Sequence, residues 1–254
     1  MLTLFHYEPY ANSMKVMLCL KEKGLDFESR YIDLLKFDQH SSELVALNSN
    51  GQVPVLVHDG AVITESTMIN EYLDDAFPEL PLRPQSPVER AHMRIWSKLI
   101  DEVLMPTVSR LGWQYRFRAF AQSIGDDEFL QRMERVPLKE MREKWSTIHG
   151  RGFTEEQLDD ARRQIRWVLD RLEERLAAKP WITSDDYSLA DINTYPMVEG
   201  ASRLYPDYCN ERRLPRTFGW LRRISERPAT REAYAMSRFG NQPGRVADAE
   251  SRAV

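Results

Sequence analysis

The first 77 residues alternate between short apolar runs typical of strands and longer segments with helical periodicity. Strand-like runs cover residues 2–6 and 27–32, and the second alternates apolar with polar positions. A helical segment over 12–23 stops before Gly24, a residue favoured directly after a helix. Asp59-Gly60 separates two apolar runs and predicts a two-residue hairpin turn. The predicted order is β-α-β-α-β-β-α, with the remaining elements at 41–47, 55–58, 61–63 and 66–77.

A proline-rich stretch separates this half from the rest of the chain. Pro78, Pro81, Pro84 and Pro87 fall within ten residues, a density that neither a helix nor a strand accommodates. Beyond them the periodicity is helical almost throughout, and helix starts of the Ser/Thr-x-x-acid or amide type occur at Ser86, Thr154 and Ser188. We predict a domain over 1–78, a linker over 79–87, an all-helical domain over 88–240 and a disordered tail over 241–254.

Composition narrows the class of protein. Of 254 residues, 42% are apolar and 29% charged, which suits a folded chain with solvated helix faces. Lys+Arg 35 against Asp+Glu 39 leaves a net charge of −4, so no nucleic acid or membrane partner is expected. No apolar run approaches the roughly 18 residues of a membrane span, and no signal peptide is visible. Cys19 and Cys209 form neither a metal motif nor a disulfide framework. A cytoplasmic enzyme or binding protein without a metal site remains.

Gln52-Val53-Pro54 stands directly before a predicted buried strand. Proline cannot donate a backbone hydrogen bond there. A cis Val53-Pro54 bond would turn the Val53 backbone outward toward a ligand, whereas a trans proline would simply begin an edge strand. The residues alone leave both possibilities open.

Two turns combine the end of a strand with the start of a helix. In Thr64-Glu65-Ser66, free helix N–H groups and the Ser66 hydroxyl could bind a carboxylate, while Glu65 could accept from an ammonium group. Together they suit a zwitterionic amino-acid head group. Asn12-Ser13 occupies the corresponding turn after the first strand, where Ser13 could donate to an anion. Simple helix capping is the alternative at both turns. A third polar cluster, Lys36, Gln39 and His40, suits a second carboxylate or an ordinary solvated loop.

In this order and spacing, these motifs resemble the glutathione S-transferase family. The resemblance covers about residues 1–235 and implies a thioredoxin-like N-terminal domain with a mixed four-stranded sheet, followed by an all-helical C-terminal domain. It also implies glutathione as co-substrate and a homodimer. By resemblance, Pro54 is cis and Val53 pairs with the cysteinyl part of glutathione. Glu65 and Ser66, with Gln52 nearby, hold the γ-glutamyl group, and His40 with Lys36 or Gln39 meets the glycyl carboxylate.

A closer resemblance is to bacterial glutathione-dependent β-aryl etherases of lignin catabolism. It rests on the long region 113–153 and on Met1–Leu4, Ala11–Ser13, Lys36–Phe37, Gly51–Pro54, Val62–Thr67 and Met93–Trp96. This resemblance implies cleavage of aromatic β-aryl ether ketones into a phenol and a glutathione thioether. Tyr10, Trp113 and Tyr115 are expected at the site of the ether. Glu8-Pro9-Tyr10 departs from the pattern by placing bulk near the sulfur.

For this reaction the site must supply glutathione as a thiolate. A free thiol has a pKa of about 8.5, and a hydrogen bond to a charged group contributes roughly 1.5–3 kcal/mol, or about one to two pKa units. We therefore expect Ser13, supported by Asn12, to stabilise the glutathione thiolate, with Tyr7 and Tyr10 as reserve donors. Detoxifying conjugation, isomerisation and a non-catalytic ligand-binding module are the competing functions. Cysteine-dependent reduction is disfavoured because neither position 12 nor position 13 is cysteine.

Overall fold

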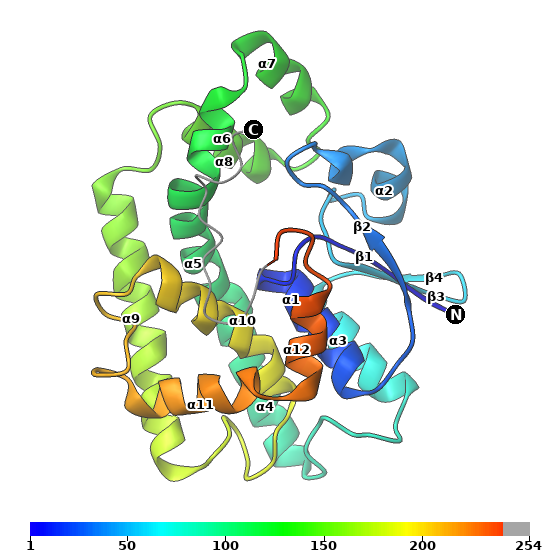
Figure 1. The fold of residues 1–254 in the computed structure, drawn as a ribbon, viewed down its shortest axis with the longest axis vertical. Helices are drawn as coiled ribbons and strands as arrows, with labels where there is room; N and C mark the ends of the chain where they lie inside the picture. Colours follow the sequence, from blue (N-terminus) through cyan, green and yellow to red (C-terminus); the bar gives the residue numbers. More distant parts are fainter. Residues whose placement is uncertain (241–254) are drawn as a thin grey trace.

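The computed structural model describes residues 1–240, so the expected disordered tail at 241–254 lies outside the described residues. The N-terminal half has the predicted order of elements, with a short 3₁₀ helix added before α2 (Figure 1). The second strand is one residue shorter at each end than predicted. The elements are β1 (Leu2–His6), α1 (Ala11–Glu22), β2 (Glu28–Tyr31), η1 (Asp38–His40), α2 (Ser42–Leu47), β3 (Val55–His58), β4 (Ala61–Ile63) and α3 (Ser66–Ala76).

The four strands form one mixed sheet in the order β2-β1-β3-β4. β1 runs parallel to β2 and antiparallel to β3, and β3 pairs with β4 through the predicted hairpin. Asp59 and Gly60 both have positive φ, +49° and +87°, as this tight turn requires. Phe5 lies opposite Val55, so the residues after β1 and those before β3 meet at one end of the sheet. The segments predicted to contain Ser13 and Val53-Pro54 therefore lie at this end of the sheet.

The C-terminal half is helical, as predicted. Two five-residue segments, η2 and η3, have π-helical hydrogen bonding, which in proteins often accompanies functional sites. Within residues 1–240, none of the helices has both the length and the apolar character to cross a membrane. The elements are α4 (Pro87–Leu99), η2 (Ile100–Leu104), α5 (Met105–Gly112), η3 (Trp113–Phe117), α6 (Arg118–Ser123), α7 (Asp126–Glu134), α8 (Lys139–His149), α9 (Glu155–Ala178), α10 (Leu189–Leu204), α11 (Pro215–Ser225) and α12 (Pro228–Ala235).

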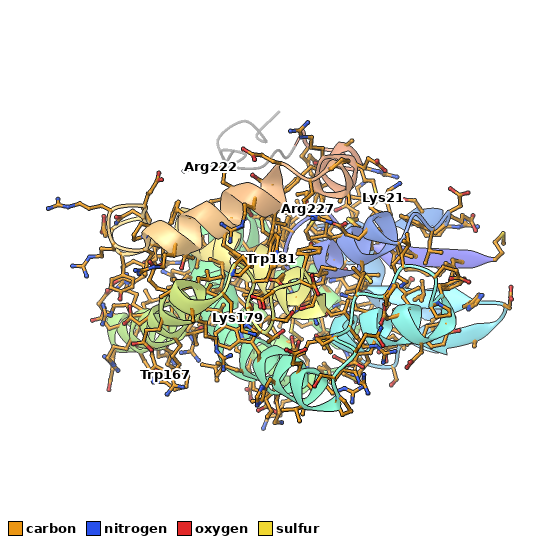
Figure 2. All side chains as sticks on the ribbon, turned by 90° about the horizontal axis from the view of Figure 1, so that it is seen from below. Lys21, Trp167, Lys179, Trp181, Arg222 and Arg227 are labelled. Atoms are coloured by element: carbon orange, nitrogen blue, oxygen red, sulfur yellow. The ribbon has the colours of Figure 1, made fainter. Side chains whose placement is uncertain are left out.

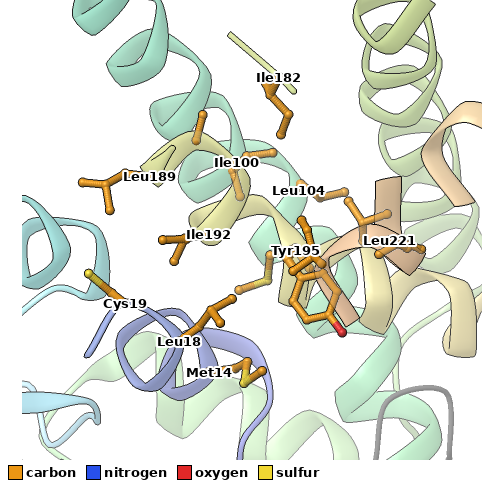
Figure 3. Packing of buried hydrophobic residues seen from close by; sticks show 14 of the residues in the cluster. Met14, Leu18, Cys19, Ile100, Leu104, Ile182, Leu189, Ile192, Tyr195 and Leu221 are labelled. Carbon is orange, nitrogen blue, oxygen red and sulfur yellow. The ribbon is translucent and has the colours of Figure 1, made fainter. Parts of the chain in front are cut away.

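The two halves share one hydrophobic core. Helix α10, buried along most of its length, packs against α1 on one side and against α4, α5 and α11 on others. Figure 3 shows Leu18 of α1 beside Ile192 and Tyr195 of α10, all of them buried. Because burial of apolar surface is the main stabilising contribution to folding, this shared core fixes α1 against the helical half.

Polar contacts on the outside of the core strengthen the junction. Arg227 donates two hydrogen bonds to Glu22 at the end of α1, at 2.5 and 2.7 Å. Figure 2 shows Arg227 on the same side of the molecule as Lys21. Asp74 of α3 accepts from the buried Lys23 ammonium at 2.9 Å and from the N–H of Leu82 in the proline-rich stretch at 2.7 Å. The linker is therefore pinned to α1 and α3.

A second core cluster lies between α6, α7 and α8 and the loop before α2. Phe37, in the left-handed region at φ +63°, is fully buried with its ring 4.6 Å from that of Trp145. Arg132 lies over the Phe37 ring and donates to the Leu35 carbonyl at 3.1 Å. The long region 113–153 therefore docks on the N-terminal half at the loop that carries Lys36 to His40.

Candidate active site

Ser13 is the third residue of α1 and is 5% exposed. Its Oγ accepts a hydrogen bond from the Tyr7 N–H at 3.2 Å. The helix begins after Tyr10 without a side-chain cap, so Ser13 does not serve as the cap that was the alternative role. A hydroxyl that accepts one bond keeps its own hydrogen for another partner. Ser13 is therefore fixed in place with a donor to offer, and half-buried Asn12 precedes it.

The Val53-Pro54 peptide bond is cis, as the resemblance implied. Pro54 is buried, while Val53 and Gln52 are half-buried. The Asn48 side-chain amide donates to the Gln52 carbonyl at 2.9 Å and holds this segment. By the pairing of β1 with β3, it lies beside the loop that leads to Ser13.

The start of α3 has the features of an anion site. Glu65 precedes the helix with φ +64°, a conformation that costs a non-glycine residue of order 1–3 kcal/mol and that is enriched at functional sites. Neither Glu65 nor another side chain caps the helix among the described residues, so its first N–H groups stay available for a carboxylate. Ser66 is buried and Glu65 is exposed. This arrangement suits the zwitterionic head group expected from the sequence.

Three residues that the sequence analysis did not identify join these segments. Lys15 is fully buried, and its Nζ donates to one oxygen of Asp101 at 2.5 Å. The Thr67 hydroxyl donates to the other Asp101 oxygen at 2.7 Å. Lys15 follows Ser13 by two residues and Thr67 follows Ser66, so Asp101 of the helical half fixes the starts of α1 and α3 relative to each other. Burial lowers the pKa of Lys15, and the adjacent Asp101 carboxylate opposes this shift.

The third predicted cluster is divided between the interior and the surface. The Lys36 side chain is 76% exposed, with its Nζ 3.7 Å from Asp33. Gln39 and His40 are buried, and the Gln39 Nε2 lies 3.3 Å from the His40 Nε2. A Cβ at Gly51 would lie 2.6 Å from the His40 Nδ1, so the imidazole packs against the backbone just before Gln52. Contact between His40 or Lys36 and a glycyl carboxylate remains a prediction.

The burial of His40 should make the stability of the protein depend on pH. Burial, with a smaller contribution from Arg135, lowers the pKa of His40 from 6.5 to about 4. As pH falls from about 6.5 to about 4, the unfolded chain gains a proton that the folded protein lacks, so this group lowers stability progressively. We expect the difference in unfolding free energy between the unchanged protein and His40→Gln to shrink over this range in urea titrations. A difference that stays constant with pH would contradict a neutral, buried His40.

The residues expected at the ether site do not all lie together. Half-buried Tyr10 has its ring 5.6 Å from that of Tyr7, close to Ser13. Trp113 packs against Trp145 in the second core cluster, at 4.7 Å between ring centroids. Tyr115, on the same π-helical segment, is 49% exposed and its hydroxyl accepts from Arg162 at 2.8 Å. Of the three, only Tyr10 is placed beside Ser13 by these contacts.

Both cysteines are buried and reduced. Burial raises the pKa of Cys19 far above its ordinary value and that of Cys209 to about 12. Both are therefore neutral thiols near pH 7, which agrees with the interpretation of Cys19 as a packed residue.

Comparison with known proteins assigns the class. Residues 1–75 match the family model of the glutathione S-transferase N-terminal domain, and residues 129–228 match that of the C-terminal domain. The chain therefore belongs to the glutathione S-transferase family. The expected fold class, a thioredoxin-like domain followed by an all-helical one, is confirmed.

Particular relatives are similar over nearly the whole chain. Protein LigF of Sphingobium sp. strain SYK-6 is 42% identical over 243 residues, which cover 93% of this chain and 94% of that protein. The crystal structure of beta-etherase LigF from that strain matches with a TM-score of 0.89 and covers 93% of this chain and 99% of LigF. A Caenorhabditis elegans protein described as a "Probable maleylacetoacetate isomerase" is 25% identical over 240 residues, 94% of each chain.

Proposed function

We propose that this protein is a glutathione transferase that cleaves β-aryl ether bonds of lignin-derived aromatic ketones. The observation that carries the substrate class is the near full-length likeness to beta-etherase LigF, at 42% identity and a TM-score of 0.89. The arrangement of Ser13, the cis Val53-Pro54 segment and the uncapped start of α3 supports glutathione as the co-substrate. The products are a phenol and a glutathione thioether.

In this proposal the Ser13 hydroxyl donates to the sulfur of glutathione and favours its thiolate. Its Oγ already accepts from the Tyr7 N–H, so its own hydrogen is available to donate to the sulfur. The cysteinyl backbone pairs with Val53, the γ-glutamyl group binds at Glu65 and Ser66 beside Gln52, and the glycyl end lies toward Gln39 and His40. Neutral His40 would offer a hydrogen bond and no charge to that end.

The reaction is a displacement at the carbon that bears the aryloxy group, next to the ketone. The thiolate supplies the electron pair of the new C–S bond, and the C–O bond breaks with its pair leaving on the phenolate. The phenolate then takes a proton from water. Attack from the side opposite the leaving group inverts the carbon. Because a chiral site holds the thiolate in one position relative to the bound ketone, the enzyme should select one enantiomer.

Chromatography of phenol released from a racemic β-aryl ether ketone and glutathione tests this function. We expect release to stop near half conversion, because only one enantiomer is attacked. No release, with glutathione binding established by calorimetry in the same sample, would keep the glutathione site and reject the ether as substrate. A screen of other electrophiles would then separate conjugation or isomerisation from a non-catalytic role.

A homodimer formed by the helical domain is part of the proposal. Arg94 of α4 donates two hydrogen bonds to Glu71 of α3, at 2.9 and 2.7 Å, and joins these helices side by side. These helices also carry two exposed apolar side chains, Met68 of α3 at 53% and Ile95 of α4 at 64%, and a second copy that docks on α4 and the adjoining α3 would cover both. We expect sedimentation at micromolar concentration to give a dimer. A monomer throughout that range would contradict it.

We place this activity in the cytoplasm, because glutathione is abundant there and keeps thiols reduced. The two free buried cysteines, Cys19 and Cys209, are compatible with that compartment.

A further inference from the structure

The loop between β1 and α1 contains a buried carboxylate with partners far away in the chain. Glu8 is 1% exposed. One of its oxygens accepts a hydrogen bond from the Ser237 hydroxyl, and the other accepts from the Arg238 backbone N–H at 3.1 Å. A buried carboxylate is costly unless it is hydrogen-bonded. The contacts therefore bind this loop to a segment about 230 residues later.

Residues 237–239 follow α12 and fold back across this loop. The Ser237 N–H donates to the Tyr234 carbonyl at 3.0 Å, and the Ser237 Oγ accepts from the Phe239 N–H at 3.2 Å. The Arg238 guanidinium lies 3.9 Å from the centroid of the Tyr31 ring. In Figure 1 residues 236–240, which follow α12, lie beside the blue start of α1, and α12 itself packs on α1. The segment is thus held by α12 at one end and by Glu8 at the other.

This segment lies close to the proposed position of the sulfur. Glu8 follows Tyr7, whose N–H donates to the Ser13 Oγ. The Tyr7 ring is 5.6 Å from the rings of both Tyr10 and Tyr31, the latter under Arg238. The residues expected to hold glutathione come from η1, from the segment before β3 and from the start of α3. Residues 237–239 contact the same loop from the end of α12, an element that carries none of those residues.

We propose that Glu8 is a positioning residue that holds residues 237–239 as one wall of the space for the electrophile's aryl group. This inference rests on the proposed function, in that Ser13 marks the place of the sulfur. The wall presents the Arg238 side chain stacked on Tyr31 and the Phe239 side chain, which is 39% exposed. The bulk of Glu8 beside the sulfur site is then the anchor of this wall.

Calorimetric binding of two ligands tests the wall: glutathione itself, and a glutathione thioether whose sulfur carries an arylalkyl group. Ser237→Ala removes the hydroxyl that donates to Glu8 and accepts from the Phe239 N–H, and it alters no residue of the β1–α1 loop. Glu8→Gln keeps the size of the side chain without its charge. We expect each variant to bind the thioether about fivefold more weakly and to keep its affinity for glutathione within about twofold. Ser237→Thr, which keeps the hydroxyl, should restore the affinity for the thioether.

Ser225→Ala is the matched control, because the Ser225 hydroxyl donates to the Arg222 carbonyl at 2.8 Å at the exposed end of α11. It should change neither affinity. Equal weakening of both ligands by Ser237→Ala would show that the segment supports the thiol loop alone and would overturn the proposal, as would no weakening of either. Phenol release by the unchanged protein is measured separately. Absence of phenol release would reject the ether as substrate. The affinity for the thioether would still test whether residues 237–239 form the wall.

Discussion

Replacing Ser13 by alanine is expected to raise the pKa of the thiol of bound glutathione by about one to two units. The variant loses the donor that stabilises the thiolate, so turnover at pH 7 should fall by about tenfold, in proportion to the thiolate fraction. Absorbance of the bound thiolate, followed against pH beside the rate of phenol release, measures both quantities. Asn12→Ala should have a smaller effect, because Asn12 has a supporting role in this account.

The control for Ser13→Ala is Ser13→Thr, which keeps a hydroxyl at the same position and should retain most of the pKa shift. Unfolding of both variants is measured as well, because the Tyr7 N–H loses its acceptor in the alanine protein. An unchanged thiol pKa and an unchanged rate would remove Ser13 from the mechanism. Tyr7 and Tyr10 would then be the donors to test, by substitution with phenylalanine.

The largest loss of stability is expected for Asp191→Ala. The Asp191 carboxylate is fully buried and accepts hydrogen bonds from four donors: the Ser188 N–H at 3.0 Å, the Ser188 hydroxyl at 3.3 Å, the Ile182 N–H at 3.2 Å and the Trp220 Nε1–H at 2.8 Å. Each buried donor left without an acceptor costs about 1–3 kcal/mol. We expect the free energy of unfolding to fall by about 3 kcal/mol or more, measured in urea.

The chain supplies a matched control for this variant. Gln157 occupies the same third position in the capping box of α9, but it binds the exposed Thr154 N–H, at 2.9 Å. Gln157→Ala should therefore cost less than about 1 kcal/mol, because water replaces the lost partner. Equal costs for the two variants would contradict the role assigned to burial.

The loss of unfolding free energy caused by Asp191→Ala should change with pH in a predictable direction. Burial raises the pKa of Asp191 to about 6, while the hydrogen bonds from Trp220, Ile182 and Ser188 oppose this shift. Between about pH 4 and 6 the folded protein binds a proton that the unfolded chain releases, so this group lowers stability as pH rises. The loss of unfolding free energy in the alanine variant should be largest below pH 4, decrease between pH 4 and 6, and stay constant above pH 6.

Local signals in the sequence predicted much of the fold. Asp59-Gly60 and Gly24 act through their own backbone preferences, and both sit at the expected turn and helix end. The capping boxes at Thr154 and Ser188 are present with both reciprocal hydrogen bonds. Ser13 and Ser66 were identified for the same reason, because a turn from a strand into a helix can be recognised within a few residues.

Contacts between distant segments could not be predicted in this way. Lys15 interrupts an apolar helical face, which is a signal for a buried cation, but its partner Asp101 lies 86 residues away. Glu8 and Ser237 are 229 residues apart, and neither has a local motif. The polar sequence around His40 suggested a solvated loop as the alternative. The region 113–153 instead docks beside this loop, and Pro137 packs close to His40 at Gly51.

In the proposed reaction the glutathione thiolate displaces the aryloxy group at a single carbon. The most direct test of this displacement is the turnover of one enantiomer of a β-aryl ether ketone with quantification of all products. We expect one phenol and one glutathione thioether of inverted configuration for each glutathione consumed. Phenol formed without an equal amount of thioether, or a thioether of retained configuration, would contradict it.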